Sequence, residues 1–382
     1  MLLEFALASK TSYVWAVTRR SIDTYELPDR AEIERAARRA YELLTVSHRR
    51  EQRRPSELAL ADLSRILLAP LAAHLSAKRL LIVGDGALHY VPFAALSAPA
   101  AAGREPAPLI VEHEVVSVPS ASVLAVQRRE LAGRQRAPKL VAVLADPVLQ
   151  ESDSRVSLRR KPTDIVALDL EHREQADRAV RSGSEAGIAS FERLPYTRAE
   201  AETIAALIPQ GQGLTALDFE ASRETMTSAR LSDYQIIHFA THGVLNSQHP
   251  ELSGVVLSLV DRRGEPLDGF VRAHEIFNLK LRSELVVISA CRTALGKEVK
   301  GEGLVGLVRG FMYAGAARVV ASVWDVRDEA TAALMKRFYE GMLKDGLRPA
   351  AALRAAQVSL LRDRRWSAPY FWAGFVLQGE WN

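Results

Sequence analysis

Two reactive side chains follow two short apolar segments of the sequence. Residues 235–241 are followed by His242 and Gly243, and residues 284–290 are followed by Cys291. Short runs rich in Ile and Val, bounded by polar residues or Gly, are typical of buried strands. Open α/β sheets bind their ligands beyond the carboxyl ends of the strands, so residues that follow two neighbouring strands can meet there. We therefore interpret His242 and Cys291 as a candidate thiol nucleophile with its base.

Hydrolysis of a peptide bond is the reaction that such a pair could perform. Sulfur attacks a carbonyl as the thiolate, and an imidazole holds the proton and delivers it to the departing amine. The N–H of Gly243 is unobstructed by a side chain, and with the N–H of Cys291 it could hold the oxyanion. The spacing, 291 − 242 = 49 positions, is close to the ~50 residues of caspases, although the sequence SACRT around Cys291 matches the caspase signature only in part.

Each of these residues also has a purely structural interpretation. Cys291 could be a buried thiol, because free cysteine behaves as a small hydrophobe, and His242 could be a hydrogen-bonded histidine at a strand end. Their combination, with Gly243 present, favours the catalytic pair. In a strand His238 would share a face with His242, but no third zinc ligand is evident. We assign His238 to the core and expect neither a metal nor a cofactor.

The composition indicates a globular protein from a reducing compartment. Of the 382 residues, 48% are hydrophobic and 25% charged, and the net charge of +4 is too small to indicate nucleic-acid binding. The single cysteine excludes an intramolecular disulfide framework. The N-terminus lacks the order of a signal peptide, and no apolar run approaches the ~18 residues that span a membrane. We expect a cytoplasmic protein that binds neither nucleic acid nor membranes.

The order of the predicted elements indicates an α/β fold. Alternation of strands and helices is typical of a mostly parallel sheet covered by helices. Thr197 followed by Glu200 matches a capping box at the start of a helix. Strands are predicted at 2–8, 11–17, 21–27, 79–86 (ending in a turn), 109–118, 139–144, 214–216, 235–241, 284–291, 318–324 and 373–377, with a hairpin-like region at 254–270. Helices are predicted at 30–44, 55–75, 120–131, 197–208, 221–229, 273–277, 303–314, 328–344 and 349–361.

Several segments resemble the CHAT family of caspase-like proteins, and together they extend over nearly the whole chain. They include HFATHG around His242, LVVISAC up to Cys291 and ASVW up to Trp324. The segments that carry the resemblance are 85–93, 194–200, 238–243, 285–291, 301–307, 313–316, 321–324 and 328–331.

The resemblance implies a caspase-like three-layer α/β/α sandwich made of two halves. A pseudo-caspase half would cover residues 1–148, where no cysteine occurs, and the catalytic half would cover 191–382. Residues 149–190 between them are charged and poor in aromatics, which is typical of a surface loop or linker. CHAT domains often follow tetratricopeptide repeats; none is present here, which suggests a stand-alone member or an excised piece.

The family also implies clan CD cysteine peptidase chemistry, related to that of caspases and separase. One departure concerns the mouth of the site: the family usually has Glu directly after the catalytic Cys, whereas this chain has Arg292. The pair itself is intact. The departure motivates an alternative, a catalytically disabled CHAT module for protein–protein interaction. A serine α/β hydrolase is excluded, because no Gly-x-Ser-x-Gly segment occurs.

The residue after Trp324 bears on specificity. In caspases and separase this position lines the pocket for the residue before the cleaved bond, and here it is Asp325, with Asp328 as a second candidate. A carboxylate there would bind Arg in a bidentate manner or attract Lys. Asp328 could instead cap the following helix. We therefore expect an intracellular cysteine endopeptidase that cleaves a protein substrate after Arg or Lys and is activated by a partner or a tetratricopeptide-repeat region.

Overall fold

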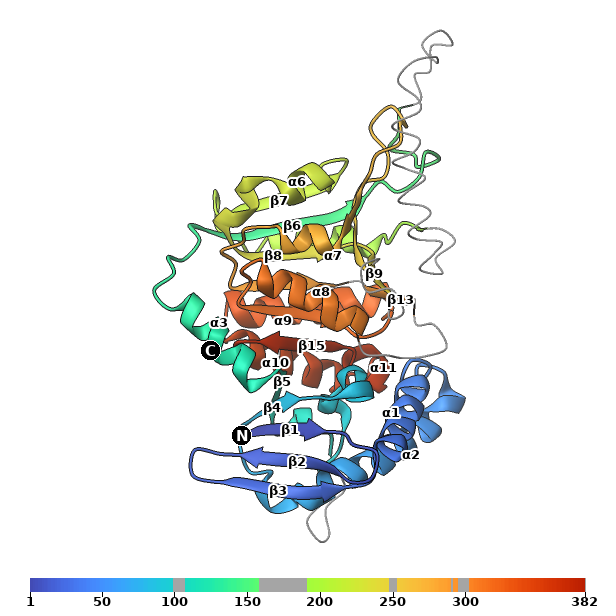
Figure 1. Cartoon of the computed structure of the whole chain (residues 1–382). Helices are drawn as coiled ribbons and strands as arrows, with labels where there is room; N and C mark the ends of the chain where they lie inside the picture. The colour runs from blue at the N-terminus through green and yellow to red at the C-terminus, as the bar shows by residue number, and fades with distance from the viewer. Residues whose placement is uncertain (99–106, 158–190, 247–252, 290, 295–301, 382) are drawn as a thin grey trace. The chain divides into compact units, whose positions relative to one another are not determined.

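The computed structural model describes residues 1–98, 107–157, 191–246, 253–289, 291–294 and 302–381 (Figure 1). They form two compact units. The first comprises Met1–Arg134 with Ser322–Asn382, and the second comprises Gln135–Glu298 with Glu302–Ala321. This grouping differs from the boundaries expected from the sequence, which follow the family resemblance and stay a prediction.

The described residues of the first unit form six strands, of which three form an antiparallel meander. Burial alternates along β1 and β2, so one face of the meander packs on the core. The strands that follow are parallel, and Leu80–Val83 are buried without interruption, as expected for a strand covered on both faces. In spatial order the strands are β3 (Ile22–Leu27), β2 (Ser12–Val17), β1 (Leu2–Ala6), β4 (Arg79–Val83), β5 (Glu114–Ser117) and β15 (Phe375–Gly379).

The helices of the first unit largely follow the predicted ranges. Asp29 caps the first of them by accepting a hydrogen bond from the Glu32 N–H, and Ile33, Ala37 and Tyr41 lie on its buried stripe. The second begins before Pro55, where the prediction had placed its start, so Pro55 lies inside it. They are α1 (Arg30–Leu44), α2 (Arg50–Leu68), α3 (Ala121–Leu131), α9 (Asp328–Leu343), α10 (Pro349–Arg362) and α11 (Pro369–Trp372).

In the second unit, the residues that the structure describes form five parallel strands and a separate four-stranded sheet. The parallel strands are, in spatial order, β14 (Arg318–Ser322), β12 (Leu285–Ile288), β8 (Tyr234–Ala240), β6 (Lys139–Pro147) and β7 (Gly213–Asp218). The smaller sheet has the order β11 (Phe270–Arg272), β10 (Gly254–Val256), β9 (Gly243–Asn246) and β13 (Cys291–Ala294), with β10 antiparallel to both neighbours and β13 parallel to β9.

The helices of the second unit are α5 (Tyr196–Ala205), α6 (Arg223–Thr227), α7 (Ala273–Phe277) and α8 (Glu302–Tyr313); α7 packs against α8, as Figure 1 shows, and α5 packs against β6, β7 and β8. The capping box predicted for α5 is wrong. Pro195 occupies the N-cap, and the Thr197 hydroxyl donates to the Leu194 carbonyl at 2.6 Å. Glu200 is buried instead of capping the helix.

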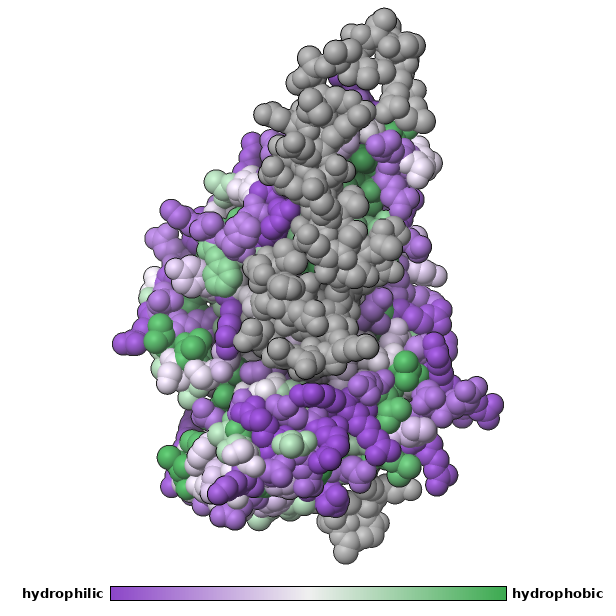
Figure 2. Space-filling model, turned by 45° about the vertical axis from the view of Figure 1, so that its right-hand side comes forward, coloured by the Kyte–Doolittle hydropathy of each residue, from purple (hydrophilic) through white to green (hydrophobic). Residues whose placement is uncertain are grey.

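The α/β architecture predicted from the sequence is confirmed, with differences at particular elements. Residues 109–118 form a short 3-10 turn, Leu109–Val111, followed by β5. The loop expected at 149–190 lies outside the described residues from 158 onward. Among the described helices, none is long and apolar enough to cross a membrane. The described residues on the face drawn in Figure 2 are mostly hydrophilic, with hydrophobic residues in small groups.

Candidate catalytic site

The structure brings His242 and Cys291 together through two neighbouring strands of the second unit. In the parallel pair β8–β12, Phe239 is the partner of Ile288. His242 and Cys291 each come three residues later, since 242 − 239 = 3 and 291 − 288 = 3. Both segments then enter the smaller sheet, where Cys291 is the partner of Gly243. The backbone of Cys291 therefore lies beside the residue that follows His242.

One expectation about these strands is wrong. The sequence predicted a strand over 284–291 that ends at Cys291, but β12 ends at Ile288 and Cys291 is the first residue of β13 in the other sheet. Cys291 thus stands at the transition between two sheets, as does His242 between β8 and β9. The side chains of Cys291 and Arg292 lie outside the described part of the structure, and the oxyanion role of the Gly243 and Cys291 N–H groups stays a prediction.

The backbone of His242 is fixed by β10. The His242 carbonyl accepts a hydrogen bond from the Val256 N–H at 2.9 Å. The preceding residue, Thr241, donates its hydroxyl to the Val256 carbonyl at 2.5 Å. These two contacts hold His242 at the sheet edge, where its side chain is buried.

The imidazole of His242 is oriented by the segment that precedes α5. Its Nε2 lies 2.6 Å from the backbone oxygen of Glu192. A carbonyl oxygen can only accept a hydrogen bond, so Nε2 carries the hydrogen, and in the neutral ring Nδ1 is then the basic nitrogen. The ring of Phe191 lies against the imidazole, with ring centroids 5.4 Å apart. Nδ1 is therefore the nitrogen of the neutral imidazole that is able to accept a proton.

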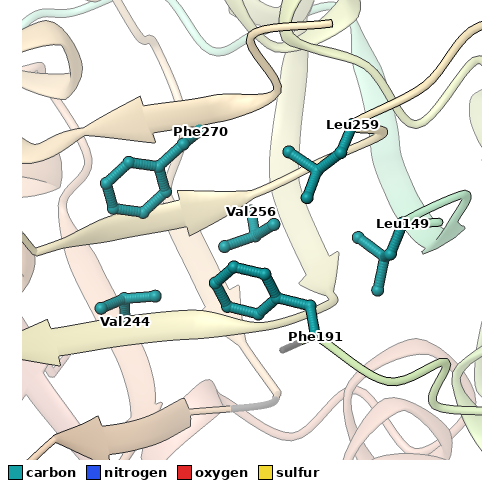
Figure 3. Packing of buried hydrophobic residues seen from close by; sticks show 6 residues of the cluster. All are labelled: Leu149, Phe191, Val244, Val256, Leu259 and Phe270. Carbon is teal, nitrogen blue, oxygen red and sulfur yellow. The ribbon is translucent and has the colours of Figure 1, made fainter. Parts of the chain in front are cut away.

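Phe191 is itself part of a small core cluster of the second unit. Figure 3 shows its ring pointing toward Val256 and Val244, which come from β10 and β9. The Gln150 side-chain amide donates to the Phe191 carbonyl at 2.9 Å. The other members of the cluster are Leu149, Leu259 and Phe270. The apolar contacts and this hydrogen bond fix the segment on which the His242 imidazole depends.

A buried carboxylate, Asp146 at the end of β6, binds three arginines. Its side chain is fully excluded from solvent. Arg193 contacts both oxygens, Nε to Oδ1 and Nη2 to Oδ2, each at 2.8 Å. Arg198 places Nε 2.8 Å from Oδ2, and Arg155 places Nη1 3.1 Å from the same oxygen. Hydrogen bonding to Asp146 raises the pKa of the Arg193 guanidinium.

Two further carboxylates share these arginines. Asp218, at the end of β7, contacts Arg155 at 2.6 Å and also Arg198. Burial acts to raise the pKa of Asp218, but its hydrogen bonds with the two guanidiniums prevail and hold it below its usual value. The hydrogen bond from Arg155 likewise lowers the pKa of Asp153 to about 2. The Asp146 network is defined here as Asp146, Asp153, Asp218, Arg155, Arg193 and Arg198.

The backbone at both strand ends is also unusual. Asp146 and Asp218 have φ angles of 48° and 54°, in the left-handed region that few non-glycine residues occupy. Aspartate tolerates this region because its short side chain can form local hydrogen bonds. The Asp146 network was not predicted from the sequence, where its one signal is an Asp at the end of each of the two strands.

His238 is buried, as predicted, but it also has an ionisable partner. Its Nε2 lies 2.7 Å from a carboxylate oxygen of Glu200, and neither side chain has any exposed surface. Glu200 comes from α5 and His238 from β8, so the pair joins the helix to the sheet. In the described residues, no group of three or more His, Cys, Asp or Glu side chains is arranged to hold a metal ion.

The predicted specificity residues belong to the first unit. Trp324 is buried and donates its indole N–H to the Tyr370 carbonyl at 2.9 Å. The Tyr370 hydroxyl donates to the backbone carbonyl of Asp325 at 2.7 Å. Burial, with the nearby charge of Asp325, raises the pKa of Tyr370 to about 12. Asp325 is exposed, and Tyr370 binds both its backbone carbonyl and the indole of the preceding Trp324.

Asp328 is the first residue of α9, whose N-cap is Arg327. The alternative interpretation of Asp328 as the helix cap is thus wrong. Its carboxylate lies in the first turn and still stabilises the helix by a favourable interaction with the helix dipole. The role of Asp325 and Asp328 as the pocket for a basic residue stays a prediction.

Comparison with known proteins gives a family and several similar chains. A family model described as "CHAT domain" matches residues 57–380. Tetratricopeptide repeat protein 28 is 36% identical over 108 residues in Mus musculus and 34% identical over 108 residues in Homo sapiens, each match covering 28% of this chain. The chain spans about 4% of the length of these relatives.

Two solved structures are similar at low sequence identity. Saccharomyces cerevisiae separase, in a complex with securin, matches 79% of this chain and 16% of its own at 14% identity and a TM-score of 0.44. The Arg-specific cysteine proteinase gingipain R matches 83% of this chain and 68% of its own at 9% identity and a TM-score of 0.41.

Proposed function

The chain belongs to the CHAT domain family, and from this premise we propose that it is a cysteine endopeptidase in which Cys291 is the nucleophile and His242 the acid–base. One observation carries the proposal. In the register of β9 and β13, Cys291 is the partner of Gly243, the residue that directly follows His242. His242 is buried, and its Nε2 donates a hydrogen bond to the Glu192 carbonyl. A histidine oriented in this way has a defined basic nitrogen, and the residue that follows it pairs with the only cysteine in the chain.

The reaction begins with a proton transfer. Nδ1 of His242 takes the thiol proton of Cys291, and the sulfur forms a bond to the carbonyl carbon of the substrate. The negative charge on the carbonyl oxygen is held by N–H groups, for which Gly243 and Cys291 are the candidates; one such donor contributes about 3 kcal/mol to transition-state stabilisation. The tetrahedral adduct then expels the amine, which receives the proton from Nδ1.

Hydrolysis of the acyl-enzyme completes the cycle. Nδ1 of His242 takes a proton from a water molecule, whose oxygen attacks the thioester carbon. The carboxylic acid product leaves and loses its remaining proton to solvent, and the proton on Nδ1 returns to the sulfur of Cys291. Throughout these steps Nε2 keeps its hydrogen bond to the Glu192 carbonyl, which stabilises the positive charge of the imidazolium.

We further propose that the substrate is a protein cut after Arg or Lys, with Asp325 as the acidic group of the pocket and Asp328 as a second candidate. The support is that Asp325 is exposed and follows a buried anchor, Trp324. We also place the activity in the cytoplasm, because a single cysteine suits a reducing compartment, and we expect a partner protein to activate it.

The test is a cleavage panel of peptides that differ only in the residue before the scissile bond, Arg, Lys, Asp or Leu. The wild-type chain and Cys291→Ala are compared, and circular dichroism checks that both are folded. We expect cleavage of the Arg and Lys peptides by the wild type and none by Cys291→Ala. Cleavage by Cys291→Ala at the wild-type rate would refute the assignment of the nucleophile.

The rival function, a disabled interaction module, is motivated by Arg292 at the position where the family usually has Glu. It predicts that neither the wild type nor Cys291→Ala cleaves any peptide. An Arg292→Glu variant that gains cleavage when the wild type has none would show that Arg292 disables an otherwise complete site.

A further inference from the structure

The buried carboxylate of Asp146 lies one residue beyond a strand pair that leads directly to His242. In the register of β6 and β8, Ala145 is the partner of Ala240. Asp146 follows Ala145, and His242 comes two residues after Ala240. A carboxylate without exposed surface has lost its hydration, and the charges of Arg155, Arg193 and Arg198 compensate that loss here.

Of the three arginines that bind Asp146, Arg193 is the one that directly follows Glu192 in the chain. The peptide group that joins Glu192 to Arg193 contains the carbonyl oxygen to which His242 Nε2 donates at 2.6 Å. Arg193 binds both oxygens of Asp146 in the two-point geometry that restricts a guanidinium most strongly. The direction of the Glu192 carbonyl is therefore coupled to the end of β6 through a single side chain.

We propose that Asp146 and Arg193 are positioning residues for His242: their ion pair orients the peptide group between Glu192 and Arg193 and so keeps the imidazole in the tautomer with hydrogen on Nε2. The effect of the ion pair on the tautomer is independent of the proposed function. Its effect on catalysis rests on that function, in which Nδ1 takes the thiol proton of Cys291. Loss of the ion pair frees the carbonyl to turn, and the tautomer with hydrogen on Nδ1 gains population. That tautomer has no lone pair on Nδ1 and is unable to accept the proton.

A second set of contacts holds the preceding residue and defines the alternative. Phe191 packs in its cluster with Val244 and Val256, and the amide of Gln150 binds its carbonyl. If these contacts alone fix the segment, the Asp146 network serves stability only. Removal of Arg193 would then lower the unfolding temperature and leave the tautomer of His242 unchanged.

The experiment compares Arg193→Gln with Arg198→Gln in the full chain. Arg198 binds the same carboxylate and is similarly half-buried, but it is not adjacent to Glu192. Nitrogen NMR of ¹⁵N-histidine-labelled protein reports the tautomer of His242, whose signals are assigned by their loss in His242→Gln. We expect Arg193→Gln to raise the share of the Nδ1–H tautomer several-fold and Arg198→Gln to leave it as in the wild type, with Arg193→Lys in between, because an ammonium keeps the charge and loses the two-point contact.

Activity provides a second readout. Arg193→Gln should lower kcat roughly 10- to 100-fold and change KM little, because the acid–base group is displaced while the binding groups remain.

An unchanged tautomer in Arg193→Gln, or equal shifts in the Arg193 and Arg198 variants, would overturn the inference. If Asp146→Asn folds, it must show the same tautomer shift as Arg193→Gln, and a wild-type tautomer in it also counts against the inference. Failure of the proposed function gives a different result: no cleavage by the wild type, with the tautomer shift of Arg193→Gln still present.

Discussion

His242 receives its contacts from two separate segments of the second unit, one around Val256 and one at residues 191–192. Its carbonyl is bound by Val256, its Nε2 donates to the Glu192 carbonyl, and its ring lies against Phe191. None of these partners is within ten positions of it in the sequence. The residue type and its spacing from Cys291 were enough to predict the pair, but its tautomer depends on contacts that no local pattern encodes.

The same reason explains what the sequence analysis missed at the residue scale. Asp146 and Arg193 are 47 positions apart, and residues 158–190 separate the strand from the segment that it binds. Thr197 and Glu200 matched a capping box because a local pattern was the only information available. In the fold, burial of Glu200 against His238 prevails over the local pattern.

A test of the His238–Glu200 pair uses Glu200→Gln. The substitution preserves size and removes a buried charge, so we expect the free energy of unfolding to fall by roughly 1 to 3 kcal/mol. Urea unfolding measures it. The matched control is Glu202→Gln on the exposed side of α5, which should change stability by less than about 0.5 kcal/mol. Equal effects of the two substitutions would show that the buried pair does not stabilise the unit.

Specificity is tested at Asp325. With Asp325→Asn we expect kcat/KM for the Arg peptide to fall about 10- to 100-fold, because a charge-assisted hydrogen bond contributes about 1.5 to 3 kcal/mol. The Leu peptide is the internal control and should be unaffected. Asp328→Asn should have the smaller effect, since Asp328 is already placed to stabilise α9. Unchanged Arg selectivity in Asp325→Asn would contradict the assigned pocket.

At the scale of elements, the strands before His242 and Cys291 end earlier than the apolar runs that predicted them. β8 ends at Ala240 and β12 ends at Ile288. Residues 285–290 contain neither Gly nor Pro, so nothing in the sequence marks the end of β12 at Ile288. The end of a strand is set by which backbone it pairs with, and here the partner changes from β8 to β9. The run of apolar residues predicted the strand, while the transition into the smaller sheet depends on tertiary pairing.

The smaller sheet is held by a close approach of two backbones at Gly254. A Cβ at this position would lie 2.3 Å from the Val271 carbonyl oxygen of β11. Gly254→Ala should therefore separate β10 from β11 and reduce stability by roughly 1 to 3 kcal/mol. Because β10 also forms a hydrogen bond with the backbone of His242, peptide cleavage by this variant should be slower as well.

The control for that prediction is Gly310→Ala in α8, where an added Cβ meets its nearest neighbours at 3.5 Å or more. Alanine is favoured over glycine within a helix by about 1 kcal/mol, so this variant should be as stable as the wild type or more so. Thermal unfolding followed by circular dichroism measures both variants. Equal stability of Gly254→Ala and the wild type would show that β10 and β11 can move apart at no cost.

On the scale of the whole molecule, the alternation of strands and helices predicted the α/β class and most element ranges. Helices at 30–44, 273–277 and 349–361 were predicted within one residue of their observed ends. The grouping of segments 1–134 and 322–382 into one compact unit follows from contacts between the two ends of the chain, such as the hydrogen bond from Tyr41 to the Val323 carbonyl. Periodicity along the sequence carries no information about such distant pairings.

The unfolding free energy of the protein should depend on pH through Asp153. Its pKa is lowered from 3.8 to about 2 by Arg155, so its contribution is complete above pH of about 4 and is lost as the pH falls through about 2. The shift corresponds to about 2 kcal/mol. Urea unfolding of Asp153→Asn should show a shallower pH dependence across this window. The same slope as in the wild type would mean that Asp153 does not contribute.

The pairing of Cys291 with His242 is the central claim, and one rate measures it directly. A peptide with Arg next to a chloromethyl ketone alkylates an activated thiol, and Cys291 is the only cysteine in the chain. We expect His242→Ala to slow this modification by about 100-fold or more relative to the wild type, because the group that takes the thiol proton is gone. Labelling of the urea-unfolded chains, which should be equal, controls for thiol content. Equal rates of modification in the folded wild type and folded His242→Ala would contradict the catalytic pair.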